Sequence, residues 1–568
     1  MARDIVVLKF GSSVLRTAAD LPAAVHEIYS WYRRGARVIA IVSAIGNTTE
    51  ALLSEARALT DEPEPHAAAE LLATGERHSA ALMGIALNRA GVAARVVDPR
   101  EIALHTQGSA LDSELVSVDR ERLSALVDEF AVLVVPGFFG YGEDERLRLL
   151  GRGGSDLTAV YLANVLGAQR CRLIKDVDGV YERDPAETAA TPLQRFVTLG
   201  YDEAVERATQ LIQPKAVRFL ERHSRNAEVA ALSRPYETVV GKVERALTAV
   251  VKPRPLSVLI LGLGTVGLGV YRRLTSLPDH FRVIGVLVRD RAKHANEGVP
   301  SELLHQSQDE LVRLQPDIVV DALPGLQPSL ALAHYYLAHG VHVVSANKAV
   351  IAEAGSELIP LAARNDLSLH YSAAVGGGAP MIEAVRRSAA TAQIQSIEGV
   401  LNGTCNYVLD RCAEGLSLDQ AVRAAQECGF AEADPSDDLR GRDAARKLSI
   451  LAQQAFGQAL SLSEISTEAL DGDLLARLQP TLGKNETLRV IASARQVDGK
   501  IVGKVKLVPV ALDDAFARTR NEWNRLRITH KGGRQSLVYG RGAGRWPTAE
   551  AVVADLLEIH SARSYRAA

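Results

Sequence analysis

The sequence predicts an α/β protein, and three observations carry that prediction. Short runs of Val, Ile and Leu recur along the chain, at 4–10, 36–44, 130–140, 171–177 and 257–264. Ala- and Leu-rich stretches with helical spacing separate these runs, an alternation typical of parallel sheets covered by helices. The third observation is a glycine-rich turn that directly follows the last of these runs.

Length and composition predict a soluble protein of three or four domains. The chain has 568 residues, 23% of them charged, and a net charge of -3, so several cores fit within it. Without long basic runs, we expect neither a nucleic acid nor a membrane partner. The first residues lack a signal-peptide pattern and no apolar run matches a membrane span, which predicts a cytoplasmic protein. Four cysteines without CxxC spacing predict free thiols and no zinc site.

The connector VVKPRPLS, residues 250–257, predicts the main boundary between two modules. It carries two prolines, follows one α/β unit and precedes a new strand, and such composition is typical of linkers. Further along, the charged stretch 513–533 is interpreted as solvated surface and loop.

The glycine-rich turn of the second module predicts a dinucleotide site. Gly262, Gly264 and Gly267 lie between a strand and a helix, with Thr265 and Val266 at the helix start. Glycines let the backbone turn tightly and approach a pyrophosphate, whose charge then meets the helix N-terminal amides. The alternative is a glycine-rich turn without a ligand.

The tip of the next strand indicates which dinucleotide is bound. The acidic residue that would hold a ribose is missing there, and Arg289 follows with Lys293 nearby. A guanidinium suits a 2′-phosphate, so NADP(H) is favoured over NAD. Two alternatives stay open: Arg289 is a surface arginine, or the adjacent Asp290 takes a ribose hydroxyl.

The stretch GFAEADPSDDLRGRDAARKLSILA, residues 429–452, predicts a reducing site. Asp443 and Lys447 are four residues apart in a helical pattern, hence on one face and within pairing distance. Beside a nicotinamide, the ammonium would polarise a carbonyl and deliver a proton while the carboxylate keeps it charged. Glu432 and Asp438 would then meet a substrate ammonium group. The alternative is a surface salt bridge among solvated acids.

Several long motifs resemble homoserine dehydrogenases over residues 256–568. They are SANKAVIA, AAVGGGAPMI, VLNGTCNYVLD, ECGFAEADPSDDLRGRDAARKL and GRGAGRWPTAEAVVADLL. The resemblance implies catalytic lysines at Lys348 and Lys447 and a substrate-orienting carboxylate at Asp443. It further implies that homoserine is bound by Glu432, Asp438 and Thr404.

This resemblance also implies the reaction and the architecture. Hydride transfer between NADPH and L-aspartate 4-semialdehyde would give L-homoserine. A Rossmann-type domain is expected at 258–384, completed by 536–568, with an α+β substrate and dimerisation domain at 385–535 that makes the chain a homo-oligomer. Backbone carbonyls around Val375 and Gly377 match the family's monovalent-cation loop. Two residues depart from the family: Ser372 stands for a glutamate and Cys405 for a threonine.

The first module begins with a phosphate-binding pattern. VVLKFGSSVL places Lys9 at a strand end beside Gly11, Ser12 and Ser13, a short loop whose amides and ammonium can reach phosphate oxygens. LLATGERHSAALM, GRGGSDLTAVYLANVLGA and KDVDGVYERDP follow in order. Together they resemble the catalytic domain of aspartate kinase, in the amino-acid kinase superfamily, over residues 1–235. A three-layer α/β domain at 1–249 is therefore expected.

The resemblance implies phosphorylation of L-aspartate by ATP with Mg²⁺, largely through positioning and charge neutralisation. Lys9 would steady the phosphoryl group and Asp156 would organise the site. Aspartate would be held by Glu76, Arg152 and Ser155. The nucleotide side would comprise Gly11, Ser12, Lys175, Asp176, Asp178, Tyr181 and Lys215.

Some residues depart from the kinase pattern. KFGSSVL is closer to glutamate 5-kinase than to aspartate kinase, Lys175 replaces a threonine, Ala186 an arginine and Gln210 a lysine. Losing cations weakens the binding of phosphates, and Lys175 or Lys215 would have to compensate. A structural alternative for Glu76 and Arg152 is a buried ion pair.

The short distance between the modules predicts a missing regulatory region. About 48 residues separate Pro214 from Gly262, too few for the pair of ACT domains that follows most aspartate kinases.

The two resemblances together give the leading hypothesis, a fused aspartate kinase and homoserine dehydrogenase on the way to threonine and methionine. The alternative is a homoserine dehydrogenase with a silent kinase-like domain used for assembly or nucleotide sensing. Phosphorylation of glutamate is a third, weaker reading.

Overall fold

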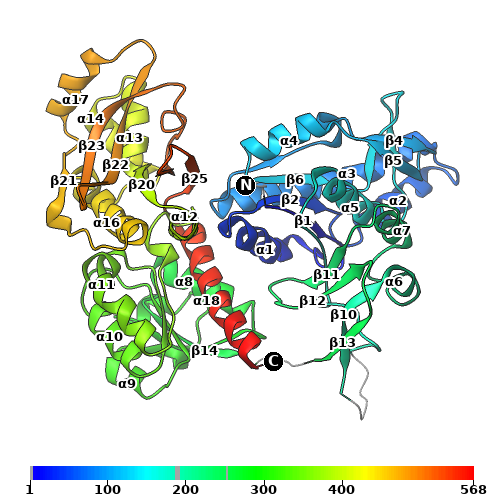
Figure 1. Ribbon diagram of the computed structural model, residues 1–568, viewed down its shortest axis with the longest axis horizontal. Coiled ribbons are helices and arrows are strands. Elements are labelled where there is room, and N and C mark those ends of the chain that lie inside the picture. Colours follow the sequence, from blue (N-terminus) through cyan, green and yellow to red (C-terminus); the bar gives the residue numbers. More distant parts are fainter. Residues whose placement is uncertain (1–3, 186–191, 251–253, 568) are drawn as a thin grey trace. The chain divides into compact units, whose positions relative to one another are not determined.

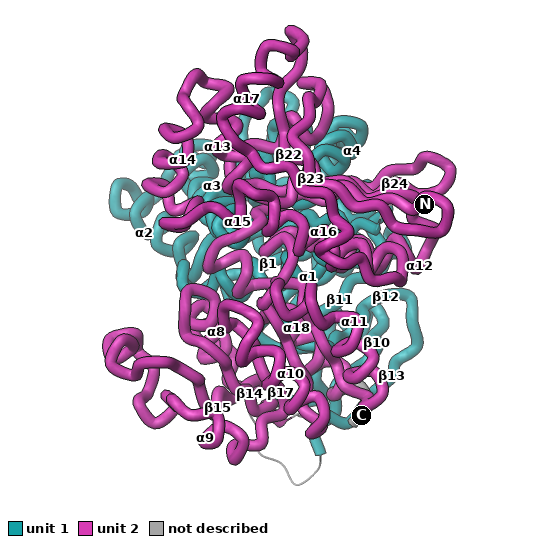
Figure 2. Tube along the Cα trace, turned by 90° about the vertical axis from the view of Figure 1, so that its left-hand side faces the viewer, with its two compact units in different colours: residues 1–252, 568 teal, residues 253–567 magenta. Residues whose placement is uncertain are grey.

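The computed structural model describes residues 4–185, 192–250 and 254–567. The chain divides into two compact units between residues 252 and 253, coloured separately in Figure 2. This division falls inside the connector at 250–257. Among the described residues, no helix combines the length and apolar character needed to cross a bilayer.

The first unit is built on a nine-stranded sheet. Its strand order is β13-β10-β12-β11-β9-β1-β2-β6-β3. The four central parallel strands are β9 (Arg170–Lys175), β1 (Ile5–Phe10), β2 (Arg37–Val42) and β6 (Val132–Pro136). They are almost wholly buried, because helices cover both faces of such a sheet and select Val, Ile and Leu throughout.

Helices cover the two faces of this sheet to give three layers. On one side, α1 (Leu21–Arg33) and α3 (Pro65–Arg89) pack together against β2. On the other, α5 (Gly154–Leu166) packs against β1 and β9 and contacts α4 (Arg120–Glu129) and α7 (Pro214–Arg222). Figure 1 labels these helices around the blue central strands. The remaining helices are α2 (Thr48–Leu59) and α6 (Tyr201–Arg207).

Residues between α7 and the second unit complete the same sheet. They form β11 (Ala227–Ala231), β12 (Glu237–Gly241) and β13 (Ala246–Ala249), which join β10 (Gln194–Gly200) at one edge; β3 (Ala94–Val96) forms the other edge. A separate four-stranded sheet is made of β5 (Ser113–Ser117), β4 (His105–Gly108), β7 (Phe139–Tyr141) and β8 (Leu147–Leu149). The described residues between α7 and the second unit are thus part of the nine-stranded sheet.

The second unit opens with a doubly wound parallel sheet. Its order is β16-β15-β14-β17-β18-β19, the order 3-2-1-4-5-6 of a Rossmann fold. The strands are β14 (Leu256–Leu261), β15 (Phe281–Leu287), β16 (Leu304–His305), β17 (Ile318–Asp321), β18 (His342–Ser345) and β19 (Leu369–His370). All neighbouring pairs are parallel.

Alternate residues of this sheet supply two cores. One joins Val258 and Ile260 to α8 (Thr265–Thr275) and the C-terminal α18 (Arg545–Ala567). The other joins Leu259 and Leu261 to α10 (Ser329–Ala338) and α11 (Lys348–Arg364), as the two-residue period of a strand requires. Figure 1 shows the red α18 lying beside the green α8. The chain end therefore completes the dinucleotide domain; α9 (Gln308–Val312) is its remaining helix.

An α+β region is inserted before α18. Its mixed sheet has the order β21-β23-β22-β20-β24-β25, with β20 (Ile394–Val400), β21 (Ile465–Thr467), β22 (Glu486–Val497), β23 (Lys500–Ala511), β24 (Trp523–His530) and β25 (Gln535–Arg541). Its helices are α12 (Met381–Thr391), α13 (Gly403–Ala413), α14 (Leu418–Glu427), α15 (Ser436–Leu439), α16 (Arg442–Phe456) and α17 (Gly472–Leu478). The buried face of α16 packs on β22 and β23.

The interpretation of 513–533 as solvated loop is wrong for part of that stretch. β24 lies inside it and pairs with β20 and β25. Its residues alternate between half-buried and buried, and Leu526 and Ile528 are fully buried. Arg525 and Arg527 occupy two of the half-buried positions, so the charge count concealed a strand with one face in the core.

Candidate active sites

The glycine-rich turn has the geometry that a dinucleotide needs. Gly262 follows β14 with a φ of +93°, and α8 begins at Thr265 with Gly264 as its N-cap. A Cβ added at Gly267 would lie 1.9 Å from the carbonyl oxygen of Gly262. No side chain fits there, while Gly264 is exposed with open space around it. The loop leaves helix amides accessible to a pyrophosphate, so these residues fit the cofactor.

The tip of the neighbouring strand carries the expected basic residues. Arg289 and Lys293 are exposed beyond β15, and the Arg289 carbonyl oxygen accepts a hydrogen bond from Gln306. Asp290 accepts one from the Ala292 amide at 2.9 Å. The Asp290 carboxylate thus caps the turn from which Arg289 and Lys293 project.

A buried carboxylate lies between two lysines in the second unit. Asp443 is in the first turn of α16 and is 3% exposed. Its Oδ1 contacts the Lys348 ammonium at the start of α11, and its Oδ2 lies 2.8 Å from Lys447 Nζ. Burial acts to raise the pKa of Asp443, but the two ammonium groups outweigh it and hold that pKa below its usual range.

Lys447 has a second partner in the loop that follows β20. Its Nζ donates a hydrogen bond of 2.7 Å to the carbonyl oxygen of Leu401. The side chain is 7% exposed, so both the carboxylate and the carbonyl act in a setting with little water. The ammonium is therefore held in one orientation, which a surface salt bridge would not achieve.

Asn402 was not singled out from the sequence, although it lies at the centre of the site. Its Nδ2 donates to Asp438 Oδ1 at 2.6 Å and to Asp443 Oδ2 at 2.8 Å. Its Oδ1 accepts a hydrogen bond from the Cys405 amide and caps α13. The only local signal was an Asn before a helical pattern, which indicates a cap and nothing more.

The other substrate residues surround this centre at different depths. Burial and the charge of Asp443 raise the pKa of Asp438. Thr404 donates a hydrogen bond to the Phe430 carbonyl oxygen, and the Cys405 thiol donates one to the Asp438 carbonyl oxygen. Glu432 is exposed on the loop before α15. The structure thus brings Asp438, Thr404 and Cys405 together with the lysine pair, and leaves Glu432 at the surface.

The expected cation loop is a tight, buried turn. Val375 is buried, and Gly377 has a φ of +53° with its Cβ position blocked by the backbone of Gly542. The Ala379 amide donates to Gly376. Ser372, which stands for the family's glutamate, donates hydrogen bonds to Asp555 from its amide and its hydroxyl.

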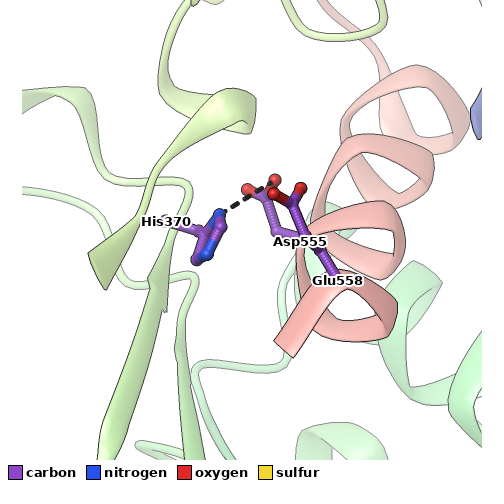
Figure 3. A group of neighbouring side chains, drawn as sticks. All are labelled: His370, Asp555 and Glu558. Carbon is purple, nitrogen blue, oxygen red and sulfur yellow. Dashed lines mark ion pairs between the residues drawn. The ribbon is translucent and has the colours of Figure 1, made fainter. Parts of the chain in front are cut away.

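Next to this loop lies the cluster drawn in Figure 3. His370 faces Asp555 and Glu558, which project from the same side of α18. Nδ1 of His370 is 3.8 Å from Asp555 Oδ1. Among the described residues, this is the one group of three His, Cys, Asp or Glu side chains close enough to share an ion. His370 belongs to β19, and Asp555 and Glu558 belong to α18, so the cluster connects these two elements. Ser372, just after β19, also bonds Asp555.

The first unit contains a second carboxylate between two lysines. Asp156, in the first turn of α5, is 2% exposed. Its Oδ1 is 2.8 Å from Lys9 Nζ and its Oδ2 is 3.2 Å from Lys175 Nζ. The lysines come from the carboxyl ends of the adjacent parallel strands β1 and β9. Burial and the charge of Lys9 lower the pKa of Lys175 to about 8, even though Asp156 opposes them.

Glu76 and Ser155 lie in the same region of the kinase-type unit. Glu76 is 3% exposed; its Oε1 accepts from the Ala44 amide, and its buried Oε2 has no hydrogen-bond partner among the described residues. Burial raises the pKa of Glu76 to about 7. Ser155 is buried beside Gly137, where a Cβ would lie 2.9 Å from its hydroxyl. Arg152 is exposed in the turn before α5, so it does not form a buried ion pair with Glu76.

The remaining kinase candidates fall into three groups. Gly11 is buried, and a Cβ added to it would lie 3.0 Å from Lys9 Nζ. Ser12 is exposed. Asp176 is exposed, while the Tyr181 hydroxyl donates to Asp178. The ammonium of Lys215 donates to Asp112, Ser113 and Leu150. These bonds engage all three Lys215 donors, whereas Lys175 shares the Asp156 carboxylate with Lys9. Ala186 lies outside the described residues.

Comparison with known proteins gives the same division of the chain. Residues 4–230 match the model of the amino acid kinase family, residues 262–372 the NAD-binding domain of homoserine dehydrogenase, and residues 380–557 homoserine dehydrogenase itself. The order of these domains is that of bifunctional aspartate kinase/homoserine dehydrogenases.

Individual relatives match the second unit. The chain is 37% identical to homoserine dehydrogenase of Synechocystis over 53% of its own length and 72% of the relative. With the Corynebacterium glutamicum enzyme it shares 31% identity over 54% of its length and 74% of the relative. A crystal structure of homoserine dehydrogenase from Thiobacillus denitrificans superposes with a TM-score of 0.51 at 31% identity, covering 55% of this chain and 74% of that one. Together with the glycine loop and the buried carboxylate between two lysines, these matches show that the chain belongs to the homoserine dehydrogenase family and carries an amino acid kinase domain ahead of its dehydrogenase.

Proposed function

We propose that the chain reduces L-aspartate 4-semialdehyde to L-homoserine with NADPH and phosphorylates L-aspartate with ATP to 4-phospho-L-aspartate. The observation that carries the first activity is the buried Asp443 carboxylate between Lys348 and Lys447 in a homoserine dehydrogenase domain. The second activity is supported by the Lys9–Asp156–Lys175 group in an amino acid kinase domain.

In the dehydrogenase, the bound nicotinamide supplies the hydride. Lys447 acts at the substrate carbonyl. Two of its three N–H donors are directed by Asp443 and Leu401, so the third can polarise the carbonyl oxygen and pass it a proton as negative charge develops. Asp443 stays ionised between the lysines and keeps both ammonium groups charged and oriented.

Substrate recognition falls to the residues around this pair. The Asp438 carboxylate would hold the substrate ammonium, with Glu432 as a second anionic partner from the surface loop. Thr404, whose hydroxyl donates to the Phe430 carbonyl oxygen, would line the substrate site. Lys348, which is 42% exposed in its side chain, is accessible enough to meet both substrate and cofactor.

Assays of the reaction in both directions, with NADPH for semialdehyde reduction and NADP⁺ for homoserine oxidation, test this proposal directly. The full-length protein is expected to consume NADPH with aspartate semialdehyde and to form NADPH from NADP⁺ with homoserine. Absence of both reactions would contradict the proposed substrates.

Two further expectations have their own tests. Adding Na⁺ or K⁺ to the assay tests a monovalent-cation site at Val375 and Gly377, and light scattering tests the expected homo-oligomer.

In the kinase, this chain's contribution is mostly charge placement. MgATP, when bound, supplies the transferred phosphoryl group. Lys9 and Lys175 would neutralise its oxygens, while Asp156 fixes both ammonium groups. Glu76, whose buried Oε2 lacks a partner within the described part of the chain, suits the ammonium of aspartate, and Ser155 and Arg152 suit its carboxylates. Gly11, Ser12, Asp176, Asp178 and Tyr181 would line the nucleotide side.

Trapping the acyl phosphate with hydroxylamine separates this proposal from a silent kinase domain. Aspartate-dependent formation of a hydroxamate with release of ADP is the expected result. If neither product forms while semialdehyde reduction proceeds, the domain serves assembly or nucleotide sensing instead. Glutamate in place of aspartate is the control for substrate class and is expected to be a poor substrate.

A further inference from the structure

Asn402 joins two carboxylates through a single amide. The residue follows β20, is 5% exposed, and caps α13 through its Oδ1. The side-chain NH₂ group has two N–H donors, and each is used: one for Asp438 at 2.6 Å and one for Asp443 at 2.8 Å. No donor capacity is left over.

The residue before it binds the third member of the group. The Leu401 carbonyl oxygen accepts from Lys447 at 2.7 Å and from the Asn524 amide at 3.0 Å. Asn524 is fully buried on β24. Two consecutive residues of one loop therefore fix Asp438, Asp443 and Lys447, which belong to two different helices.

We propose that Asn402 is a positioning residue of the dehydrogenase reaction, whose amide holds the substrate-binding carboxylate and the lysine-binding carboxylate side by side, both as ionised acceptors. This inference rests on the roles proposed above for Asp438 and Asp443. Asn402 itself contacts neither hydride nor carbonyl in this role. It sets the spacing between the point where the substrate ammonium is held and the point where its carbonyl is protonated.

The charge balance explains why an amide is needed here. A buried carboxylate and a half-buried one that are bonded to the same nitrogen repel each other, and such a pair takes up a proton unless donors compensate. Burial and Asp443 raise the pKa of Asp438, and the bond from Asn402 opposes that rise. A protonated Asp438 would no longer attract a substrate ammonium as an anion.

The neighbouring charges come from each packed element. Lys348 of α11 and Lys447 of α16 balance the two carboxylates. Arg446 of α16 is bonded to Asp437 of α15 at 2.7 Å, so those two charges compensate each other. The Cys405 thiol on α13 stays neutral because burial raises its pKa. A third carboxylate at position 402 would upset this balance.

The competing explanation is that Asn402 serves only as a helix cap. Asn402→Asp separates the two roles, because aspartate caps a helix N-terminus as well as asparagine does but cannot donate two hydrogen bonds. Asn402→Ser also keeps a cap and offers one donor. Ser417→Asp, at the exposed N-cap of α14, is the matched control for a new charge at a cap.

The experiment measures homoserine oxidation by the full-length protein across pH, with NADPH binding and Tm for each variant. Asn402→Asp and Asn402→Ser are expected to lower kcat/KM by about 10–100-fold, as loss of a supporting hydrogen bond typically does. In Asn402→Asp the acid limb of the profile should move upward by about one pH unit. NADPH affinity should stay at the wild-type value. Tm of Asn402→Asp should fall more than that of Ser417→Asp, because the new carboxylate at position 402 is buried next to two others.

Two results would overturn the inference. The first is that Asn402→Asp has the rate and the pH profile of the wild type. The second is that Asn402→Asp loses activity and Tm together while the acid limb of its pH profile stays in place, which assigns only a capping role to Asn402. If Asn402→Asp does not fold, Asn402→Ser decides by the same criteria. Lys447→Ala is measured in parallel: turnover in that variant would refute the proposed site itself, whereas its inactivity with a normal Asn402→Asp refutes only the role of Asn402.

Discussion

At the residue scale, the two candidate sites use the same arrangement of charges. Asp156 lies between Lys9 and Lys175, and Asp443 between Lys348 and Lys447. Burial alone would raise the pKa of each carboxyl, yet both are held below the usual range by their ammonium neighbours. In the first unit, one carboxylate and two ammonium groups leave a net positive charge, which suits a phosphoryl group. In the second, Asp438 adds a further carboxylate that offsets this charge, and the Lys447 ammonium is the group that suits a developing alkoxide.

Glu76 gives a pH prediction for the kinase. Burial raises the pKa of Glu76 to about 7, so its carboxyl is neutral below that pH and anionic above it. Binding of the aspartate ammonium requires the anion, so KM for aspartate should rise as pH falls through 7. Initial rates at several pH values measure this, and Glu76→Gln should show a high KM without that pH limb. A flat KM in the wild type would contradict the role of Glu76.

Arg289 gives a prediction for cofactor choice. Its exposed guanidinium beyond β15 suits the 2′-phosphate that NADPH has and NADH lacks. Arg289→Ala should raise KM for NADPH by about tenfold, the loss of one charge-assisted contact, and leave KM for NADH unchanged. Equal effects on both cofactors would show that Arg289 does not contact the 2′-phosphate.

At the element scale, the turn between β14 and α8 depends on the absence of a side chain. A Cβ at Gly267 would lie 1.9 Å from the Gly262 carbonyl oxygen. Gly267→Ala should therefore displace the turn, cost about 1–3 kcal/mol of stability and weaken NADPH binding. Thermal unfolding and fluorescence titration measure both effects. Gly298→Ala is the control with open space around its Cβ but a positive φ of its own, and should leave cofactor binding intact.

The elements predicted from the sequence were the strands buried on both faces. The runs at 4–10 and 36–44 contain β1 and β2, and the run at 171–177 covers β9 except for its first residue, because a strand covered by helices on each side must be apolar throughout. The α/β class and the two domain types are confirmed. β24 escaped because two arginines lie on its half-buried face and only Leu526 and Ile528 on its buried face are apolar.

Asn402 escaped for a different reason. Its two acceptors lie 36 and 41 residues along the chain, and neither helical periodicity nor local spacing links a loop residue to them. The Asp443–Lys447 pair was accessible from the sequence because both residues belong to one helix. Tertiary packing then added Lys348, Leu401 and Asn402 to that pair, which local patterns alone do not predict.

At the scale of the whole molecule, each unit contains its own cores and its own candidate site. The kinase candidates lie in the first unit and the dehydrogenase candidates in the second. Residues 254–568 expressed alone should therefore fold and retain the semialdehyde reductase kcat/KM of the full chain within about threefold. Circular dichroism and steady-state kinetics measure this. A folded fragment without activity would show that the first unit contributes to the dehydrogenase site.

The most direct test of the account is homoserine oxidation by Lys447→Ala, with NADPH affinity measured by fluorescence titration. Removing the ammonium that meets the substrate carbonyl should lower kcat by at least about 10²–10⁴-fold, the usual contribution of a positioned acid or base. NADPH affinity should be unchanged, because the glycine loop is intact. Turnover at the wild-type rate would contradict the central claim that Lys447 carries out the proton transfer.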